Sequence, residues 1–307
     1  MRIFITGILG QLGYNLATLL YLDGHDIMGS INQSHRFPDF LSNKIYQLNL
    51  YPGFQLLDQV QKIPKDIDLF IHCAAYTDVN QSEYELSKVY KINSESTHFL
   101  SNWANNYNIP FLYISTDFVF EGYCDGNNEL TLPNPQGHYS RSKYFGELNC
   151  KSKENSHIIR WTPLVHCFSL PHHPPNFTNW LINSTKQKAK LQLFCDKTLT
   201  PVSSLQIANA IRKPNLPELL HVPSLETNSV HQLATSILNY FDLPNNHHKT
   251  KFPSTNSYGK IRPQHSGLDT LLFDKKSLVQ DFEECKNLIK TLPLNWRKKL
   301  GSNPLLD

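Results

Sequence analysis

Two polar side chains four residues apart, Tyr139 and Lys143, can carry acid–base chemistry. Residues at this spacing share one face of a helix, so the phenol and the ammonium group can address one site. An ammonium group beside a phenol favours the phenolate, and we expect it to lower the pKa of Tyr139 toward working pH. Such a tyrosine can give a proton to a developing alkoxide and recover it from solvent. The same spacing occurs by chance on solvated helix faces, so the neighbouring motifs decide the interpretation.

A threonine hydroxyl, that of Thr116, follows the apolar run 111–114 closely. Ligands of doubly wound sheets bind beyond the carboxyl ends of the strands, so Thr116 is placed to hydrogen-bond a substrate carbonyl; a simple cap of a strand-end turn is the alternative. The small residues Ala74 and Ala75 end another predicted strand. They would let a flat cofactor approach the backbone, and a tight strand–helix contact explains them equally well.

The N-terminus predicts the cofactor. A short apolar run, 3–5, leads into Gly7, Gly10 and Gly13, which are followed by a helical pattern. Glycines at this spacing allow a tight turn, a close approach of the backbone to a pyrophosphate, and helix–strand packing, while the helix N-terminus offers free N–H groups. This pattern favours a bound dinucleotide over a plain strand–helix turn.

The end of the second predicted strand indicates which dinucleotide is bound. NAD-binding proteins usually place an acidic residue there, whereas residues 30–36 contain no carboxylate. Ser30 and Arg36 would accommodate and neutralise a 2′-phosphate, unless Arg36 simply faces water. We therefore expect a preference for NADPH, with NADH as the alternative.

The elements that must position these residues alternate along the chain. Expected strands alternate with expected helices, and this order predicts an α/β protein with a Rossmann-type, doubly wound parallel sheet. The expected strands are 2–6, 26–31, 45–49, 67–73, 110–115 and 157–160, and the expected helices are 11–22, 54–61, 83–104 and 138–152.

The alternation weakens after about residue 161. We expect an NAD(P)-binding domain over 1–160 and a smaller C-terminal α/β substrate lobe over 161–307, with segments around 190–225 returning to the first domain. Helices are expected in this lobe near 176–188, 203–212, 228–240, 274–280 and 294–300.

Composition argues against several other functions. A net charge of +3 without a Lys/Arg stripe disfavours nucleic-acid binding. The first strand begins at residue 2 and no apolar run nears the ~20 residues of a membrane helix, so a cytoplasmic location without membrane contact is expected. Six scattered cysteines without a CxxC pair indicate reduced thiols rather than a zinc site. The pairs His172-His173 and His247-His248 lie among Pro and Asn, which favours solvated loops over metal ligands.

Taken together, these motifs resemble the extended short-chain dehydrogenase/reductases, and more narrowly the dTDP-4-dehydrorhamnose reductases. The resemblance is dense over 1–160 and continues beyond as scattered landmarks. The residues that carry it are Thr6-Gly7-x-x-Gly10-x-x-Gly13, Ala74-Ala75-Tyr76-Thr77, Asn93, the run 115–120 and Tyr139-x-x-x-Lys143. It implies NADPH-dependent reduction of the 4-keto group of a nucleotide-linked 6-deoxysugar, in a protein that can form a homodimer.

The resemblance also implies residue roles. Catalysis is expected from Thr116, Tyr139 and Lys143, and substrate binding from Thr116, Asp117, Asn176 and Arg262. With Ser30 and Arg36 added from the strand-end argument, the expected cofactor-binding residues are Gly7, Gly10, Gln11, Leu12, Gly13, Ser30, Arg36, Asn49, Leu50, Ala74, Ala75, Tyr76, Asn93, Tyr139 and Lys143. No metal is expected, because Asn15 replaces an acid that helps to hold magnesium in some relatives.

Two alternatives remain open. Pro163 stands where family members often carry tryptophan, and the segment 161–180 looks unlike theirs. A reductase or epimerase for a UDP- or GDP-linked keto-sugar would use the same machinery. A non-catalytic NADP-binding subunit, similar to the regulatory beta subunit of methionine adenosyltransferase, would share the fold.

Overall fold

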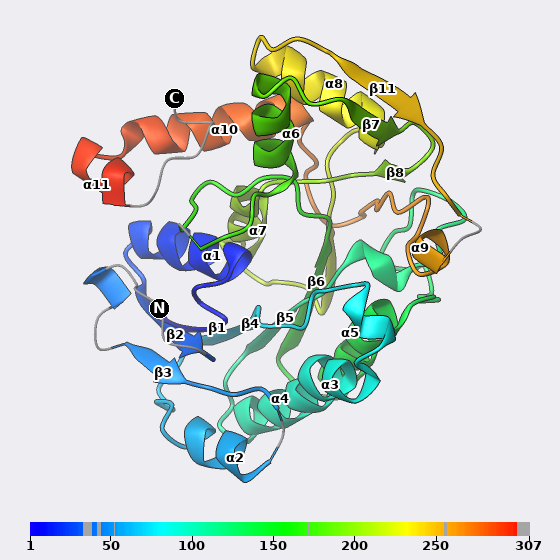
Figure 1. Ribbon diagram of the computed structural model, residues 1–307. Coiled ribbons are helices and arrows are strands. Elements are labelled where there is room, and N and C mark those ends of the chain that lie inside the picture. Colours follow the sequence, from blue (N-terminus) through cyan, green and yellow to red (C-terminus); the bar gives the residue numbers. More distant parts are fainter. Residues whose placement is uncertain (33–38, 42–43, 52, 171, 255–256, 300–307) are drawn as a thin grey trace.

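The computed structural model describes residues 1–32, 39–41, 44–51, 53–170, 172–254 and 257–299. Within them, a seven-stranded parallel sheet forms the centre of the molecule, in the order β3-β2-β1-β4-β5-β6-β9 (Figure 1). Its strands are β1 (Arg2–Thr6), β2 (Asp26–Ile31), β3 (Ile45–Gln47), β4 (Leu69–His72), β5 (Phe111–Ile114), β6 (Ser156–Trp161) and β9 (Leu219–Val222). Strand order reverses between β1 and β4, which is where such sheets bind ligands. The predicted doubly wound α/β fold is confirmed.

The strands form because their apolar side chains are buried on both faces of the sheet. Successive side chains of a strand point to opposite faces. In β1, Ile3 and Ile5 join the core under α1, whereas Phe4 joins the opposite core with Phe70 and Trp103. The sheet is therefore covered on both sides, as its near-continuous apolar strands require.

Helices cover the two faces. The helices α1 (Gln11–Leu22) and α7 (Ser204–Ile211) pack on one face, and α2 (Phe54–Val60), α4 (Ser96–Asn106) and α5 (His138–Lys151) lie on the other (Figure 1). The last of these, α5, carries both Tyr139 and Lys143. It packs against β5 and β6 and so brings these residues to the carboxyl end of the sheet.

The single helix predicted over 83–104 is wrong in detail. The chain instead forms a 3₁₀ turn (Gln81–Glu83), α3 (Leu86–Tyr90), a π-helical turn (Lys91–Glu95) and α4. Asn93 lies in the π-helical turn, and its side chain pairs with the backbone of Tyr76: Tyr76 N–H donates to Oδ1 at 2.7 Å and Nδ2 donates to Tyr76 O at 3.0 Å. Widening of the helix thus places Asn93 where it holds the loop after β4.

The rest of the chain forms a smaller α/β part above the sheet. It contains α6 (Phe177–Lys186), β7 (Leu191–Phe194), β8 (Thr198–Leu199), β10 (Asn228–Ser229), α8 (Val230–Tyr240), β11 (His247–Thr250), α9 (Ser257–Lys260), α10 (Leu278–Thr291) and α11 (Leu294–Lys299). Strand β11 pairs with β7 in parallel, and β10 pairs with β8 in antiparallel fashion. The segment 204–222 leaves this part, because α7 packs on α1 and β9 pairs with β6.

Two expectations for this region are wrong. The helix predicted near 274–280 begins at Leu278 and continues to Thr291, because Ser277 caps it by accepting a hydrogen bond from Gln280 N–H. The pair His247-His248 belongs to β11 rather than to a loop, since both residues pair with β7.

Candidate active site

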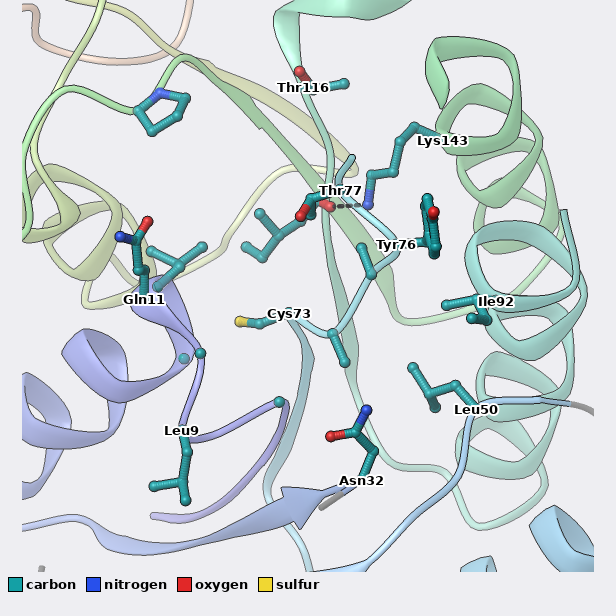
Figure 2. Close-up of a pocket in the computed structure, with 18 of the residues that line it drawn as sticks. Leu9, Gln11, Asn32, Leu50, Cys73, Tyr76, Thr77, Ile92, Thr116 and Lys143 are labelled. Atoms are coloured by element: carbon teal, nitrogen blue, oxygen red, sulfur yellow. Dashed lines mark hydrogen bonds between the residues drawn. The ribbon is translucent and has the colours of Figure 1, made fainter. Parts of the chain in front are cut away.

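A cavity of about 1040 Å³ opens at the carboxyl ends of β1, β2, β4 and β5 (Figure 2). It extends from the end of β2, across the glycine turn, to α5. The predicted residues that line it are Gly7, Gly10, Gln11, Leu12, Gly13, Ser30, Asn49, Leu50, Ala74, Ala75, Tyr76, Thr116, Asp117, Tyr139 and Lys143. Six separate stretches of the chain therefore converge on one cavity.

The glycine turn forms the cavity floor, and its shape leaves no room for side chains. Gly7 has φ +62°, and a Cβ on it would lie 3.0 Å from Ala74. A Cβ on Gly13 would lie 2.2 Å from O of Gly7. Gly10 N–H donates to the same oxygen at 2.8 Å, and α1 begins with Gln11. The turn thus directs the N-terminus of α1 into the cavity, as dinucleotide binding requires.

A buried histidine that the sequence analysis missed supports this turn. His72, at the end of β4, lies with Nδ1 2.7 Å from Oγ1 of Thr6 and Nε2 3.2 Å from Oγ1 of Thr97. Ala74 N–H donates to Oγ1 of Thr6 at 3.1 Å. Burial, with the nearby charge of Lys143, lowers the pKa of His72 to about 3, so the ring is neutral. These hydrogen bonds connect β1 to the loop after β4. They join residues far apart in the chain, so no local sequence pattern predicts them.

The end of β2 carries no acid among the described residues that line the cavity. Ser30, Ile31 and Asn32 line the cavity there, together with Asn49 and Leu50 from the loop after β3. Figure 2 shows Asn32 and Leu50 at this end of the cavity. Arg36, predicted to neutralise a 2′-phosphate, lies outside the described residues.

Thr116 and Tyr139 lie at the other end of the cavity. Oγ1 of Thr116 accepts from Phe118 N–H at 3.2 Å and lies 3.0 Å from Oδ1 of Asp117. Burial raises the pKa of Tyr139 above its ordinary value, the Asp117 carboxylate adds to this rise, and a hydrogen bond with Thr116 opposes it. The phenol therefore keeps its proton at neutral pH.

Lys143 lies behind these groups, and its contacts change one expectation. Its Nζ donates to O of Ile114 at 2.7 Å and sits 4.1 Å from the ring centre of Tyr113 (Figure 2). Burial lowers the pKa of Lys143 to about 8, although Glu147 opposes this shift. The expected lowering of the pKa of Tyr139 is wrong for this structure, since burial of the phenol outweighs any effect of the ammonium group, which is directed to a backbone carbonyl.

Of the predicted residues within the described ranges, three do not line the cavity. Asn93 acts through the backbone of Tyr76. Asn176 caps α6 by accepting from Asn179 N–H at 3.0 Å. Arg262 donates to Oδ1 of Asn80 at 2.8 Å and stacks 3.9 Å above the ring of Tyr258.

Several lining residues were not predicted. The largest group comes from β6 and the loop that follows it, a segment that departs from the family pattern and therefore contains no recognisable motif. They include Trp161, Thr162, Pro163, His166, His172, His173 and Pro174, together with Lys88 and Ile92 from the α3 region. His172 and His173 lie in a loop, as expected, where His172 is exposed and His173 is half-buried, and both also line the cavity.

Comparison with known proteins identifies the family. The profile of the RmlD substrate binding domain matches residues 1–292. The chain belongs to this family. One relative of this RmlD-family chain is a probable low-salt glycan biosynthesis reductase of Haloferax volcanii, which is 29% identical over 210 residues, 68% of each chain. A second is the dTDP-4-dehydrorhamnose reductase of Aggregatibacter actinomycetemcomitans, which is 29% identical over 211 residues, 68% of this chain and 66% of the relative. The chain thus aligns with about two thirds of each relative's length.

Solved structures agree with this assignment. The dTDP-4-dehydrorhamnose reductase of Bacillus anthracis, in complex with NADP, superposes with a TM-score of 0.78 at 25% identity, covering 94% of this chain and 99% of that chain. A hypothetical dTDP-4-dehydrorhamnose reductase of Sulfolobus tokodaii has a TM-score of 0.72 at 28% identity, covering 99% and 98%. The resemblance of this RmlD-family chain to the extended short-chain dehydrogenase/reductases is confirmed.

Two features are absent from the described ranges of this RmlD-family chain. These ranges contain no helix with the length and apolar character needed to cross a membrane. They also hold no group of three or more His, Cys, Asp or Glu side chains arranged for a metal ion.

Proposed function

We propose that this chain is an NADPH-dependent oxidoreductase that reduces the 4-keto group of a nucleotide-linked 6-deoxysugar in nucleotide-sugar biosynthesis. One observation carries the proposal: the glycine turn and the trio Thr116, Tyr139 and Lys143 line the same cavity. A non-catalytic subunit that only binds NADP needs the glycine turn but not the three catalytic side chains. Convergence of a proton donor, a second hydroxyl and a buried ammonium group at the far end of that cavity favours an enzyme.

The cavity fits NADPH on its own geometry. The turn around Gly7 and Gly13 has no space for a Cβ, which leaves its backbone exposed to a diphosphate. At the end of β2, Ser30 and Asn32 leave room beside the ribose without a carboxylate to repel a 2′-phosphate. When bound, the nicotinamide supplies a hydride to the carbonyl carbon.

The side chains of the chain supply the rest of the chemistry. Tyr139 donates its proton to the carbonyl oxygen and regains one from solvent, so the carbonyl gains one hydride and one proton in total. Thr116 donates a hydrogen bond to the same oxygen and stabilises the charge that develops on it. Lys143, fixed to O of Ile114, is available to the nicotinamide ribose.

The substrate end of the cavity is polar. Thr116, Asp117 and Thr162 line it and can bind sugar hydroxyl groups, and Pro163 and His166 line the same cavity. Asn176 and Arg262 stay predicted substrate residues that would reach the nucleotide from outside the cavity described here. A cytoplasmic location, a homodimer and a division of the chain near residue 160 are part of the same proposal.

The direct test is consumption of NADPH with a panel of 4-keto-6-deoxysugars linked to dTDP, UDP or GDP. We expect turnover with the dTDP-linked sugar. Turnover confined to a UDP- or GDP-linked sugar would assign the same chemistry to another nucleotide. Tight NADPH binding with no turnover on any sugar would contradict the proposal and favour a regulatory subunit.

The cofactor is tested separately. We expect kcat/KM to be higher with NADPH than with NADH. The variant Ser30→Asp should reverse this preference, because a carboxylate there accepts the ribose 2′-OH and repels a 2′-phosphate. A clear NADH preference of the unaltered protein would contradict the assignment.

A further inference from the structure

Two cysteines from distant parts of the chain face each other in the core. Cys167 lies in the loop after β6, and Cys285 lies on α10 (Figure 1). Their Sγ atoms are 3.4 Å apart, although 118 positions separate the two residues in the sequence. Both residues are 0% exposed, and both thiols are free in this structure. The fold therefore holds two buried thiols within contact distance of each other.

The start of α7 holds both cysteines in place. The backbone N–H of Cys167 donates to Oγ of Ser204 at 3.4 Å. On α10, the carboxylate of Asp281, one turn before Cys285, accepts from the backbone N–H of Ser203 at 2.7 Å. Ser203 and Ser204 are neighbours in the chain, so the loop and the helix are attached to the same point. This attachment, rather than the weak contact between the sulfur atoms, brings the two thiols together.

The pair is close enough to be joined but is protected while it stays packed. An S–S bond is about 2 Å long, so sulfur atoms at 3.4 Å need to approach by little more than about 1 Å. The hydrogen bond with Cys167, together with burial, raises the pKa of the Cys285 thiol. Because the thiolate is the reacting form, exchange takes place when α10 opens locally. Once formed, a bond at this position is shielded from reductants by the same burial.

We propose that Cys167 and Cys285 form a reversible disulfide bond, which links the loop after β6 to α10, when the protein meets a small disulfide such as oxidised glutathione. During local opening, the thiolate of one cysteine attacks the oxidant and releases one glutathione thiolate. The thiolate of the other cysteine then displaces the second glutathione. The two protein thiols lose two electrons and two protons in total, and one oxidised glutathione becomes two reduced molecules.

The bond also affects the cavity described above. Cys167 directly follows His166, which lines the cavity together with Thr162 and Pro163. A covalent link to α10 limits the movement of this part of the cavity wall. It also closes a long loop of the chain, which reduces the conformational entropy of the unfolded state. The inference does not rest on the proposed reductase function.

The test is oxidation of the whole chain by oxidised glutathione, sampled from minutes to days. Urea below the unfolding transition is included, because it promotes the local opening that buried thiols need. After alkylation of the remaining thiols, peptide mapping without reductant locates each disulfide. The exposed Cys124 can form only a glutathione adduct by this route, which mapping identifies by its mass.

Three variants accompany the unaltered protein. Cys167→Ala and Cys285→Ala each remove one member of the pair. Cys150→Ala is the matched control, because Cys150 is also 0% exposed but lies on α5. We expect a peptide joined through Cys167 and Cys285 in the unaltered protein and in Cys150→Ala, and not in the other two variants.

Oxidation should raise the Tm of the unaltered protein by about 5 °C, as for a long closed loop, and a dithiol reductant should reverse the shift. Cys167→Ala and Cys285→Ala should show no such shift between oxidised and reduced samples. Three results overturn the inference: a pair that stays reduced below the unfolding transition, a disulfide between other cysteines, or a linked form whose Tm is no higher than that of the reduced form. None of these measurements uses NADPH turnover, so failure of the reductase proposal leaves the inference intact.

Discussion

Arg160 and Glu147 form an ion pair that is fully buried behind the catalytic helix. Nη2 of Arg160 lies 2.6 Å from Oε2 of Glu147, Nε lies 2.9 Å from Oε1, and both side chains are 0% exposed. Ser115 donates to Oε1 of the same carboxylate at 2.5 Å. Glu147 also lies one helical turn after Lys143, so this pair connects β6 and the end of β5 to the helix that carries the catalytic residues.

Glu147→Gln should lower the free energy of unfolding by about 3–5 kcal/mol, because it leaves the Arg160 guanidinium buried without a compensating charge. Urea unfolding measures the change. Asp274→Asn is the control: Asp274 pairs with Lys213 but is 98% exposed, so its loss should be close to neutral. Equal effects of the two substitutions would show that the buried pair contributes little.

Tyr139→Phe should bind NADPH normally and turn over about 10²–10⁴-fold more slowly, because it removes a positioned proton donor and keeps the ring. Steady-state kinetics and a binding titration separate the two effects. Tyr144→Phe, on the same helix but outside the cavity, should keep full activity. Near-normal turnover by Tyr139→Phe would refute its role as the acid.

Gly13→Ala should lose NADPH affinity by at least tenfold and stability by about 1–3 kcal/mol, since a Cβ at 2.2 Å from O of Gly7 forces the turn open. Gly24→Ala separates these effects. Gly24 has φ +83° and nothing within 4 Å of a Cβ, so alanine there is strained but leaves the cavity unchanged. Retention of affinity by Gly13→Ala would mean that the turn does not hold the diphosphate.

The reaction should slow as pH rises above about 8. Burial lowers the pKa of Lys143 to about 8, so the ammonium group loses its charge there, whereas the raised pKa of Tyr139 keeps its proton. The profile of kcat/KM against pH reports these groups in the free enzyme. A profile that stays flat to about pH 9.5 would contradict the assignment.

The same shift affects stability with a definite sign. Between about pH 8 and the ordinary lysine value of 10.5, the unfolded chain binds a proton at Lys143 that the folded chain has released. The contribution of Lys143 to the free energy of unfolding therefore rises with pH across this window. The variant Lys143→Met has no group that titrates at this position, so this rise should be absent from it. Urea unfolding midpoints of the unaltered protein and of Lys143→Met, measured at several pH values, test the difference.

Local patterns predicted much of the fold and part of the site. The runs that became β1 and β5 are apolar because both faces of the sheet are covered, and burial of this kind is visible in a few consecutive residues. Gly7, Gly10 and Gly13 were recognisable because a turn of this shape needs glycine at fixed spacing. The prediction of a single helix over 83–104 was wrong, because Asn93 pairs with the backbone of Tyr76 and one turn of the helix is widened. The spacing of apolar residues along the sequence does not show such a change.

The sequence by itself determined the doubly wound sheet, the dinucleotide turn and the Tyr139–Lys143 pair, because each depends on residues that are neighbours in the chain. Only the tertiary structure decided that His72 supports the turn, that Arg160 neutralises Glu147, and that His172 and His173 contact O of Leu9. These contacts join residues up to 164 positions apart. They depend on how the sheet and its loops pack, and that packing leaves no pattern in any one segment of the sequence.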